Sequence, residues 1–130
     1  MTKIDIINET VKFYNLTNRG FGVGSCMYLT EEGNMCAVGR CMINPKDTQL
    51  KFGSGSIRGI ACKMNNIDRT ISKIELDTMS VDHLLKPEYH GHNVEFWSDI
   101  QTLHDSYNNW NDDGLTEAGQ KVVNELLIKY

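Results

Sequence analysis

The clearest structural signal in this 130-residue chain is NVEFWSDIQTLHDSY, at positions 93–107. Asn93 belongs to the residue types that cap helix N-termini, because its side chain accepts a backbone N–H of the first turn. The apolar side chains that follow recur every three or four residues: Val94, Trp97, Ile100, Leu103 or His104, and Tyr107. We therefore predict an amphipathic helix that begins after Asn93 and packs on a core.

Both ends of the chain predict further helices. At the N-terminus Thr2 can cap a helix that ends near Asn15, with an apolar stripe at Ile4, Ile7, Val11 and Tyr14. The last helix begins at Thr116 and offers the core Val122, Val123, Leu126 and Leu127. The polar turn 108–114 joins it to the 93–107 helix, which makes a C-terminal helical hairpin.

The middle of the chain predicts a small antiparallel sheet. Residues 26–39 form two short apolar runs around Thr30–Asn34, the pattern of a β-hairpin, which would bring Cys26 and Cys36 close together. Four further segments are expected here: a turn at 44–47, strands at 57–64 and 70–76, and a short helix from Ser80 that ends at Lys86-Pro87.

The glycine-rich segment Gly20–Ser25 is not predicted to bind phosphate. No Lys-Ser/Thr pair follows it, and it lacks both the spacing and the preceding strand of a dinucleotide motif. A connection or a close backbone contact is the better interpretation. The elements together predict one α+β domain over residues 1–130, with an N-terminal helix, a small antiparallel sheet and the C-terminal hairpin.

Composition narrows the class of protein. Apolar residues make up 40% of the chain and charged residues 23%, as in globular domains. No apolar run approaches the ~20 residues of a membrane span. Asp5 and Glu9 interrupt the first apolar segment, unlike a signal peptide, so we expect a cytoplasmic protein.

Charge is unevenly distributed along the chain. The net charge is −4, which argues against direct nucleic-acid binding. Residues 1–74 hold ten Lys/Arg and six Asp/Glu, hence +4, whereas residues 75–130 hold three and eleven, hence −8. Opposed faces or self-association into a homo-oligomer would follow from this imbalance, and two unrelated solvated surfaces are the alternative.

The most enzyme-like set of residues is Cys36 with His104 and Asp105. A cysteine nucleophile needs a nearby base, and the imidazole needs an orienting acceptor. Two observations weigh against a thiol-dependent enzyme: Cys36 is predicted in mid-strand, and Asp105 points about 100° around the helix from His104. The alternative for Cys26, Cys36, Cys41 and Cys62 is that of small buried thiols in a reducing compartment.

A zinc-stabilised module is a further alternative. His90 and His92 alternate on an extended segment and would point the same way, with Cys36 and Cys41 as further ligands. His83 and His104 are the remaining imidazoles. The spacing lacks a second cysteine pair, so we expect no metal and no cofactor.

Two groups of residues suggest binding. Trp110, with Tyr107 and Asn109, would form an exposed aromatic surface ringed by hydrogen-bonding groups. Its alternative is a ring folded back as a lid over the helical hairpin. A second group, Arg19, Arg40 and Arg58, would clamp an anionic ligand such as a nucleotide, and scattered solvated arginines are its alternative.

Four short motifs also stand out: Gly24-Ser-Cys26-Met-Tyr28, Met35-Cys-Ala-Val-Gly-Arg40, Ile100-Gln-Thr-Leu-His-Asp105 and Trp110. Together they resemble a loose family of small uncharacterised proteins of bacteria and tailed phages. In that family a paired-cysteine hairpin ending in Cys-Ala-Val-Gly precedes a helix with Leu-Gln-x-x-His-Asp. Ile100 replaces the expected leucine, and Cys41 and residues 45–76 have no clear counterpart. The resemblance implies a genomic setting and no reaction.

The sequence thus favours a non-catalytic cytosolic accessory protein. Its expected partner is a host protein or a small anionic ligand, which it would inhibit or trap. This expectation rests on the small size, the incomplete catalytic geometry and the divided charge, and on an analogy with other small phage proteins.

Overall fold

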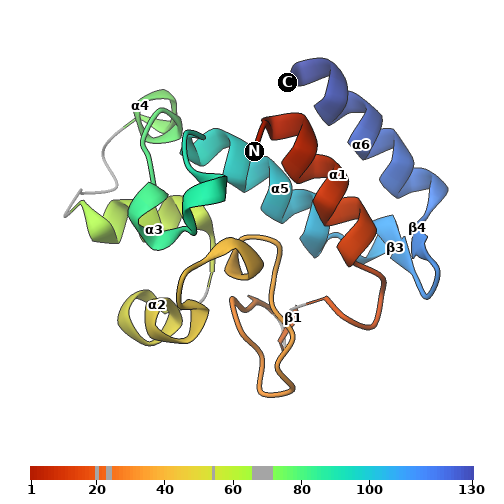
Figure 1. Ribbon diagram of the computed structural model, residues 1–130, viewed down its shortest axis with the longest axis horizontal. Coiled ribbons are helices and arrows are strands. Elements are labelled where there is room, and N and C mark those ends of the chain that lie inside the picture. Colours follow the sequence, from red (N-terminus) through yellow and green to blue (C-terminus); the bar gives the residue numbers. More distant parts are fainter. Residues whose placement is uncertain (20, 23–24, 54, 66–71) are drawn as a thin grey trace.

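The computed structural model describes residues 1–19, 21–22, 25–53, 55–65 and 72–130. Helix α5 (Val94–Asp105) runs through the middle of the molecule, as Figure 1 shows. Its predicted cap is confirmed, because Oδ1 of Asn93 accepts the backbone N–H of Phe96. Eight of its twelve residues are buried, more than one helix face can supply, so α5 packs against neighbours on two sides.

Helices α1 (Lys3–Phe13) and α6 (Glu117–Lys129) pack on one side of α5 and on each other. Thr2 caps α1 through a reciprocal pair of hydrogen bonds with Asp5, and Thr116 caps α6. Both predicted helices are confirmed. The predicted stripe is partly wrong, because Ile4 is exposed and its neighbour Ile6 is buried instead.

Helices α3 (Ile57–Met64) and α4 (Lys73–Asp77) cover the other side of α5, and α2 (Pro45–Phe52) packs on α3. The strands predicted at 57–64 and 72–76 are therefore wrong, as is the turn at 44–47; residues 70–71 lie outside the described residues. Each helix begins at a capping side chain: Asn44, Ser56 and Ser72.

The hairpin predicted at 26–39 is confirmed only at its turn. Thr30 and Asn34 are joined by a backbone hydrogen bond of 2.8 Å, and Gly33 has a positive φ of 87°. The flanking segments are not paired strands, and residues 39–41 form the 3₁₀ helix η1 (Gly39–Cys41). A hairpin lies earlier instead, where β1 (Phe21–Gly22) pairs antiparallel with β2 (Ser25–Cys26).

Parts of two sequence predictions lie outside the described residues. They concern Gly20, Val23 and Gly24 of the glycine-rich segment and the side chain of Cys26, hence its expected proximity to Cys36. Nothing in the described structure therefore tests these two predictions.

Short elements complete the chain between the helices. The helix predicted after Ser80 is the 3₁₀ helix η2 (Asp82–Leu84), and Pro87 begins η3 (Pro87–Tyr89). After α5 come η4 (Tyr107–Asn109), β3 (Trp110–Asn111) and β4 (Gly114–Leu115). The strands β3 and β4 pair antiparallel and return the chain to α6.

The α+β class is therefore confirmed: an N-terminal helix, small antiparallel hairpins and a C-terminal helical hairpin. The helices α2 to α4 occupy the place where the sequence predicted most of the sheet. Within the described ranges, every helix is too short or too polar to cross a membrane.

The junction of η4 and α6 predicts a sharp difference between two helical glycines. A Cβ added to Gly119 would lie 2.3 Å from the Asn109 carbonyl oxygen, whereas one added to Gly59 of α3 would meet only Ser56 Oγ, at 3.3 Å. We expect Gly119→Ala to lower the free energy of unfolding by about 2 kcal/mol or more, because the backbone must shift. Gly59→Ala should be neutral or stabilising, since alanine favours helix. Urea denaturation of both variants checks this, and equal stabilities would contradict it.

Candidate functional site

Arg40 lies in a largely buried charged cluster with Glu9 and Tyr89. The Arg40 side chain is 10% exposed, and its Nη1 donates to the Glu9 carboxylate. The Tyr89 hydroxyl donates to the same carboxylate. The Phe13 ring lies over the guanidinium at 5.1 Å. Burial alone would raise the pKa of Glu9, but the hydrogen bonds from Tyr89 and Arg40 outweigh it and lower that pKa. The cluster therefore holds α1, η1 and η3 together.

Arg19 and Arg58, the other two arginines of the predicted clamp, serve separate contacts. Arg19 donates to the carbonyls of His104 and Asp105 and so caps the end of α5. Arg58 donates to Asp77 at 2.8 Å and to Ser98, which joins α3 to α4 and α5. All three guanidinium groups bond to other parts of the fold. The predicted anion clamp is therefore wrong, and so is its alternative of scattered solvated arginines.

Cys36 and His104 are both fully buried. The Cys36 Sγ accepts the backbone N–H of Gly39 at 3.2 Å, in a turn rather than in the predicted strand. The sulfur is therefore not open to a substrate, which the thiol-dependent enzyme requires. Burial also raises the pKa of the nearby Cys41 thiol to about 12, which disfavours its thiolate.

The relation between His104 and Asp105 differs from the prediction. Nδ1 of His104 lies 2.7 Å from Asp105 Oδ1, so the adjacent carboxylate does reach the ring. The side-chain torsions of His104 and Asp105 bring the two groups together although successive residues of a helix are about 100° apart around its axis. The pair faces the protein interior on the histidine side and solvent on the aspartate side, where a third of the carboxylate side chain is exposed.

Trp110 is not an exposed recognition residue. It is 2% exposed, and its indole Nε1 donates to the carbonyls of Leu103 and His104, both at 3.1 Å. The polar residues around Trp110 in the sequence suggested an exposed turn. Burial of this large ring, with its N–H hydrogen-bonded, instead stabilises the helical hairpin. Asn109 is also buried and donates to Leu103, whereas Tyr107 is 68% exposed. The alternative interpretation, a ring folded back on the hairpin, describes Trp110.

The histidines do not gather around a common point. Nε2 of His90 lies 2.9 Å from the Leu85 carbonyl oxygen, and Nε2 of His92 lies 2.9 Å from that of Met1. Burial lowers the pKa of His92. Across the described ranges, no three His, Cys, Asp or Glu side chains are arranged to hold a metal ion, so the alternative ligand set with Cys36 and Cys41 is not assembled.

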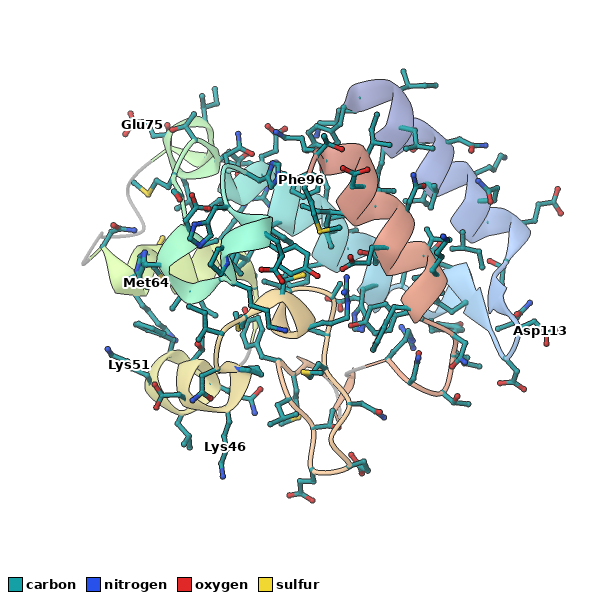
Figure 2. All side chains as sticks on the ribbon, in the orientation of Figure 1. Lys46, Lys51, Met64, Glu75, Phe96 and Asp113 are labelled. Carbon is teal, nitrogen blue, oxygen red and sulfur yellow. The ribbon has the colours of Figure 1, made fainter. Side chains whose placement is uncertain are left out.

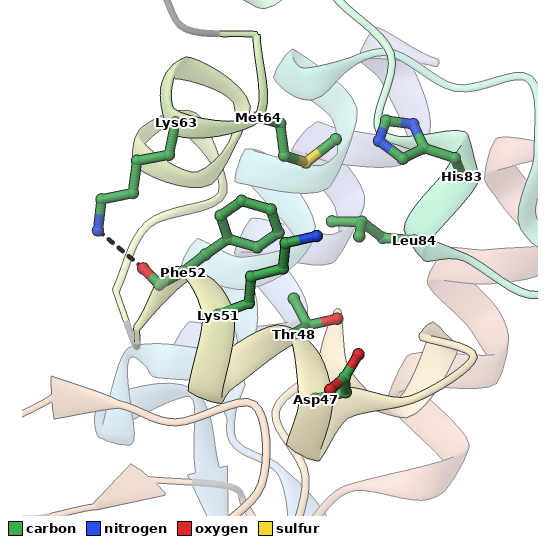
Figure 3. Close-up of a pocket in the computed structure, with 8 residues that line it drawn as sticks. All are labelled: Asp47, Thr48, Lys51, Phe52, Lys63, Met64, His83 and Leu84. Atoms are coloured by element: carbon green, nitrogen blue, oxygen red, sulfur yellow. Dashed lines mark hydrogen bonds between the residues drawn. The ribbon is translucent and has the colours of Figure 1, made fainter.

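A pocket of about 360 Å³ lies where α2, α3 and η2 meet, and we call it the α2–α3 pocket (Figure 3). Its lining residues are Asp47, Thr48, Lys51, Phe52, Lys63, Met64, His83 and Leu84. Figure 2 shows Lys51 and Met64 at the end of the molecule opposite Asp113. A volume of about 360 Å³ is typical of small-molecule sites, and the pocket lining combines apolar and charged side chains as such sites do.

Two kinds of side chain face one another in the α2–α3 pocket. Phe52, Met64 and Leu84 provide a half-buried apolar floor. The Lys51 ammonium extends across this floor, 5.5 Å from the Phe52 ring centroid, and His83 approaches from the opposite side. Within the described part of the chain, no acceptor or carboxylate pairs with the Lys51 ammonium. The pocket can therefore offer a positive charge to a ligand.

Lys63 forms part of the wall rather than a free cation. Its Nζ donates to the Phe52 carbonyl at 2.7 Å and so caps the end of α2 (Figure 3). The acceptor is uncharged, so the positive charge of Lys63 still adds to the field of the pocket.

Sequence reasoning missed this pocket, except for His83, which it named as a spare imidazole. The signal was present, because Asn44 followed by Pro45 is typical of a helix N-terminus. A helix there places Asp47 and Lys51 one turn apart on the same face.

A second pocket, between α3 and α5, is more polar but its main groups are engaged. Arg58 and Ser98 bond to each other, and Gln101 accepts the N–H of Ile57 while donating to the Gly55 carbonyl. These contacts fasten α3 to α5, so the α2–α3 pocket is the better candidate site.

Comparison of this chain with known protein families, with curated proteins and with solved structures finds no match. The case for a function therefore rests on the geometry of its side chains.

The Arg40 cluster predicts a pH-dependent loss of stability. Because the folded-state pKa of Glu9 is lowered from 4.5, its contribution is complete above pH 4.5 and is lost as pH falls through the lower, folded-state value. We expect Glu9→Gln to lower the free energy of unfolding at pH 7 by about 2 kcal/mol, since Arg40 loses its charged partner. Urea titrations at several pH values should show this gap shrinking below pH 4.5. Glu31→Gln, in an exposed turn, is the control, and a constant gap would contradict the assignment.

The buried thiols predict slow alkylation. We expect iodoacetamide to modify Cys36 of the native protein at pH 7 at least about 100-fold more slowly than glutathione, because labelling needs local opening. Peptide mass spectrometry measures the rate, and the same protein in urea supplies the unprotected control. A Cys36 that reacts faster than glutathione would favour the thiol-dependent enzyme instead.

Proposed function

We propose that this protein is a non-catalytic binding protein that holds a small organic anion in the α2–α3 pocket. The observation that carries the proposal is the Lys51 ammonium, which has no anionic partner in the described structure and lies over an apolar floor opposite His83. A positive group beside a half-buried aromatic ring favours a ligand with an anionic head and an apolar body.

The interior residues support binding over catalysis. The candidate nucleophile Cys36 is fully buried, and so is the imidazole of His104. In the pocket itself the Thr48 hydroxyl donates to the Asn44 carbonyl at 3.1 Å, which leaves it poorly placed as a nucleophile. The groups that remain suit recognition of charge and shape.

A small ligand is favoured over a host protein as the primary partner. A hollow of about 360 Å³ suits a compact molecule, whereas protein partners bury broad surfaces of about 800 Å² on each side. A cytoplasmic location belongs to the same proposal, supported by the free thiols of Cys36, Cys41 and Cys62, which a reducing compartment maintains. The genomic setting we propose, a phage or a bacterium, rests on the sequence resemblance alone.

Phenyl phosphate, an anion with one apolar ring, tests this proposal. We expect binding with a Kd of about 1 mM, seen as amide shifts in ¹⁵N NMR spectra at α2, the end of α3 and η2. Lys51→Gln should weaken it at least about fivefold, because the anion loses its nearest cation. Lys46→Gln is the matched control, since Lys46 is exposed on the same helix and does not line the pocket. Equal weakening by both variants, or shifts confined to other elements, would contradict the proposal.

A further inference from the structure

The α2–α3 pocket contains an acid as well as cations. Asp47 lines it one helical turn before Lys51, on the same face of α2. A ligand that is anionic over its whole surface would be repelled by this carboxylate. The occupant must therefore present hydrogen-bond donors towards Asp47 and its anionic group towards Lys51 and His83.

The balance of charge selects a strong anion over a zwitterion. The lining residues carry two ammonium groups, on Lys51 and Lys63, and one carboxylate, on Asp47, before any charge on His83 is counted. Lys63 is bonded to a carbonyl oxygen, so no carboxylate neutralises it within the described structure. A zwitterionic amino acid has no net charge and would leave this positive field unbalanced, whereas a phosphate monoester carries up to two negative charges.

The floor of the pocket favours a flat ligand body. The Phe52 ring is half-buried, and the Met64 thioether packs on one side of it (Figure 3). The exposed Lys51 side chain crosses the other side, so a base takes that face when the ammonium turns outward to the phosphate. Aromatic rings beside basic groups bind nucleobases by stacking, which every base allows because each has a π-face. Phe52, Met64 and Leu84 would thus cover the apolar face of a base.

From these three features we infer that the ligand is a nucleoside monophosphate, an inference that rests on the proposed function of the same pocket. Its phosphate lies between Lys51 and His83, its base lies on Phe52, and its hydroxyl or amino donors face Asp47. The cationic region beside Lys51 and the pocket volume of about 360 Å³ suit one phosphate and one nucleoside.

Four probes separate the parts of this ligand in NMR or calorimetric titrations of the full chain: adenosine 5′-monophosphate, ribose 5-phosphate, adenosine and phenylalanine. We expect adenosine 5′-monophosphate to bind about tenfold more tightly than either ribose 5-phosphate or adenosine, because it makes both the phosphate and the stacking contacts. Phenylalanine should bind more weakly than the nucleotide.

Two variants test the assigned contacts, because each should change the affinities of two ligands differently. Phe52→Leu should weaken adenosine 5′-monophosphate about tenfold and leave ribose 5-phosphate unchanged, since only the base uses the ring. Asp47→Asn should strengthen phenyl phosphate, which lacks donors and is only repelled by Asp47, and should weaken the nucleotide several-fold relative to phenyl phosphate, because the donors of the nucleotide lose a charged acceptor. The unchanged affinity of ribose 5-phosphate also shows that Phe52→Leu is folded; Lys46→Gln is again the matched control.

The outcomes distinguish this inference from the proposal beneath it. If phenyl phosphate binds in the pocket but adenosine 5′-monophosphate binds no more tightly than ribose 5-phosphate, the nucleotide assignment fails and the anion site stands. Tighter binding of phenylalanine than of the nucleotide overturns the assignment in the same way. If neither phosphate shifts the pocket resonances, both the assignment and the anion site are overturned.

Discussion

Burial of α5 on two sides is the constraint on which the rest of the structure depends. Its apolar residues face α1 and α6 in one direction and α3 and α4 in the other, so this one helix lies at the centre of the core. The polar residues of α5 also position the neighbouring helices. Gln101 bonds the backbone at Ile57 and Gly55, and Ser98 accepts from Arg58, which fixes the start of α3. Because α3 forms one wall of the α2–α3 pocket, the candidate site is ultimately positioned by α5.

Several residues that the sequence suggested for binding or catalysis instead serve the packing of the protein interior. Arg40 and Glu9 join distant segments, Trp110 closes the helical hairpin, and Cys36 fills a turn. Arg40 donates to Glu9, the indole of Trp110 donates to two carbonyls, and the sulfur of Cys36 accepts a backbone N–H, so each of these buried groups makes at least one hydrogen bond. The α2–α3 pocket differs, since its Lys51 has no such partner within the described structure.

Helices with side-chain caps and a clear apolar period could be predicted from the sequence, as α1, α5 and α6 show. The helices α2 and α3 were missed because each has only eight residues: the start of α2 was interpreted as a turn, and the apolar spacing of α3 also fits a strand. At Ile57 and Ile60 the isoleucines suggested a sheet, while the decisive cue was the Ser56 cap. Burial of Trp110 depended on tertiary packing that no local pattern reports. The pocket was missed for a related reason, since three separate segments meet there and their meeting required α2 to be a helix.

The bond from Lys63 to the Phe52 carbonyl bears on how rigid the hollow can be. This contact bridges the two eight-residue helices across the mouth, and it is made by a long, solvent-exposed chain of methylenes with many rotamers. Breaking this contact removes one hydrogen bond, a small contribution beside the packing around α5. The rim of the hollow is therefore held at this point by a bond that can break and re-form while the packing around α5 is unchanged.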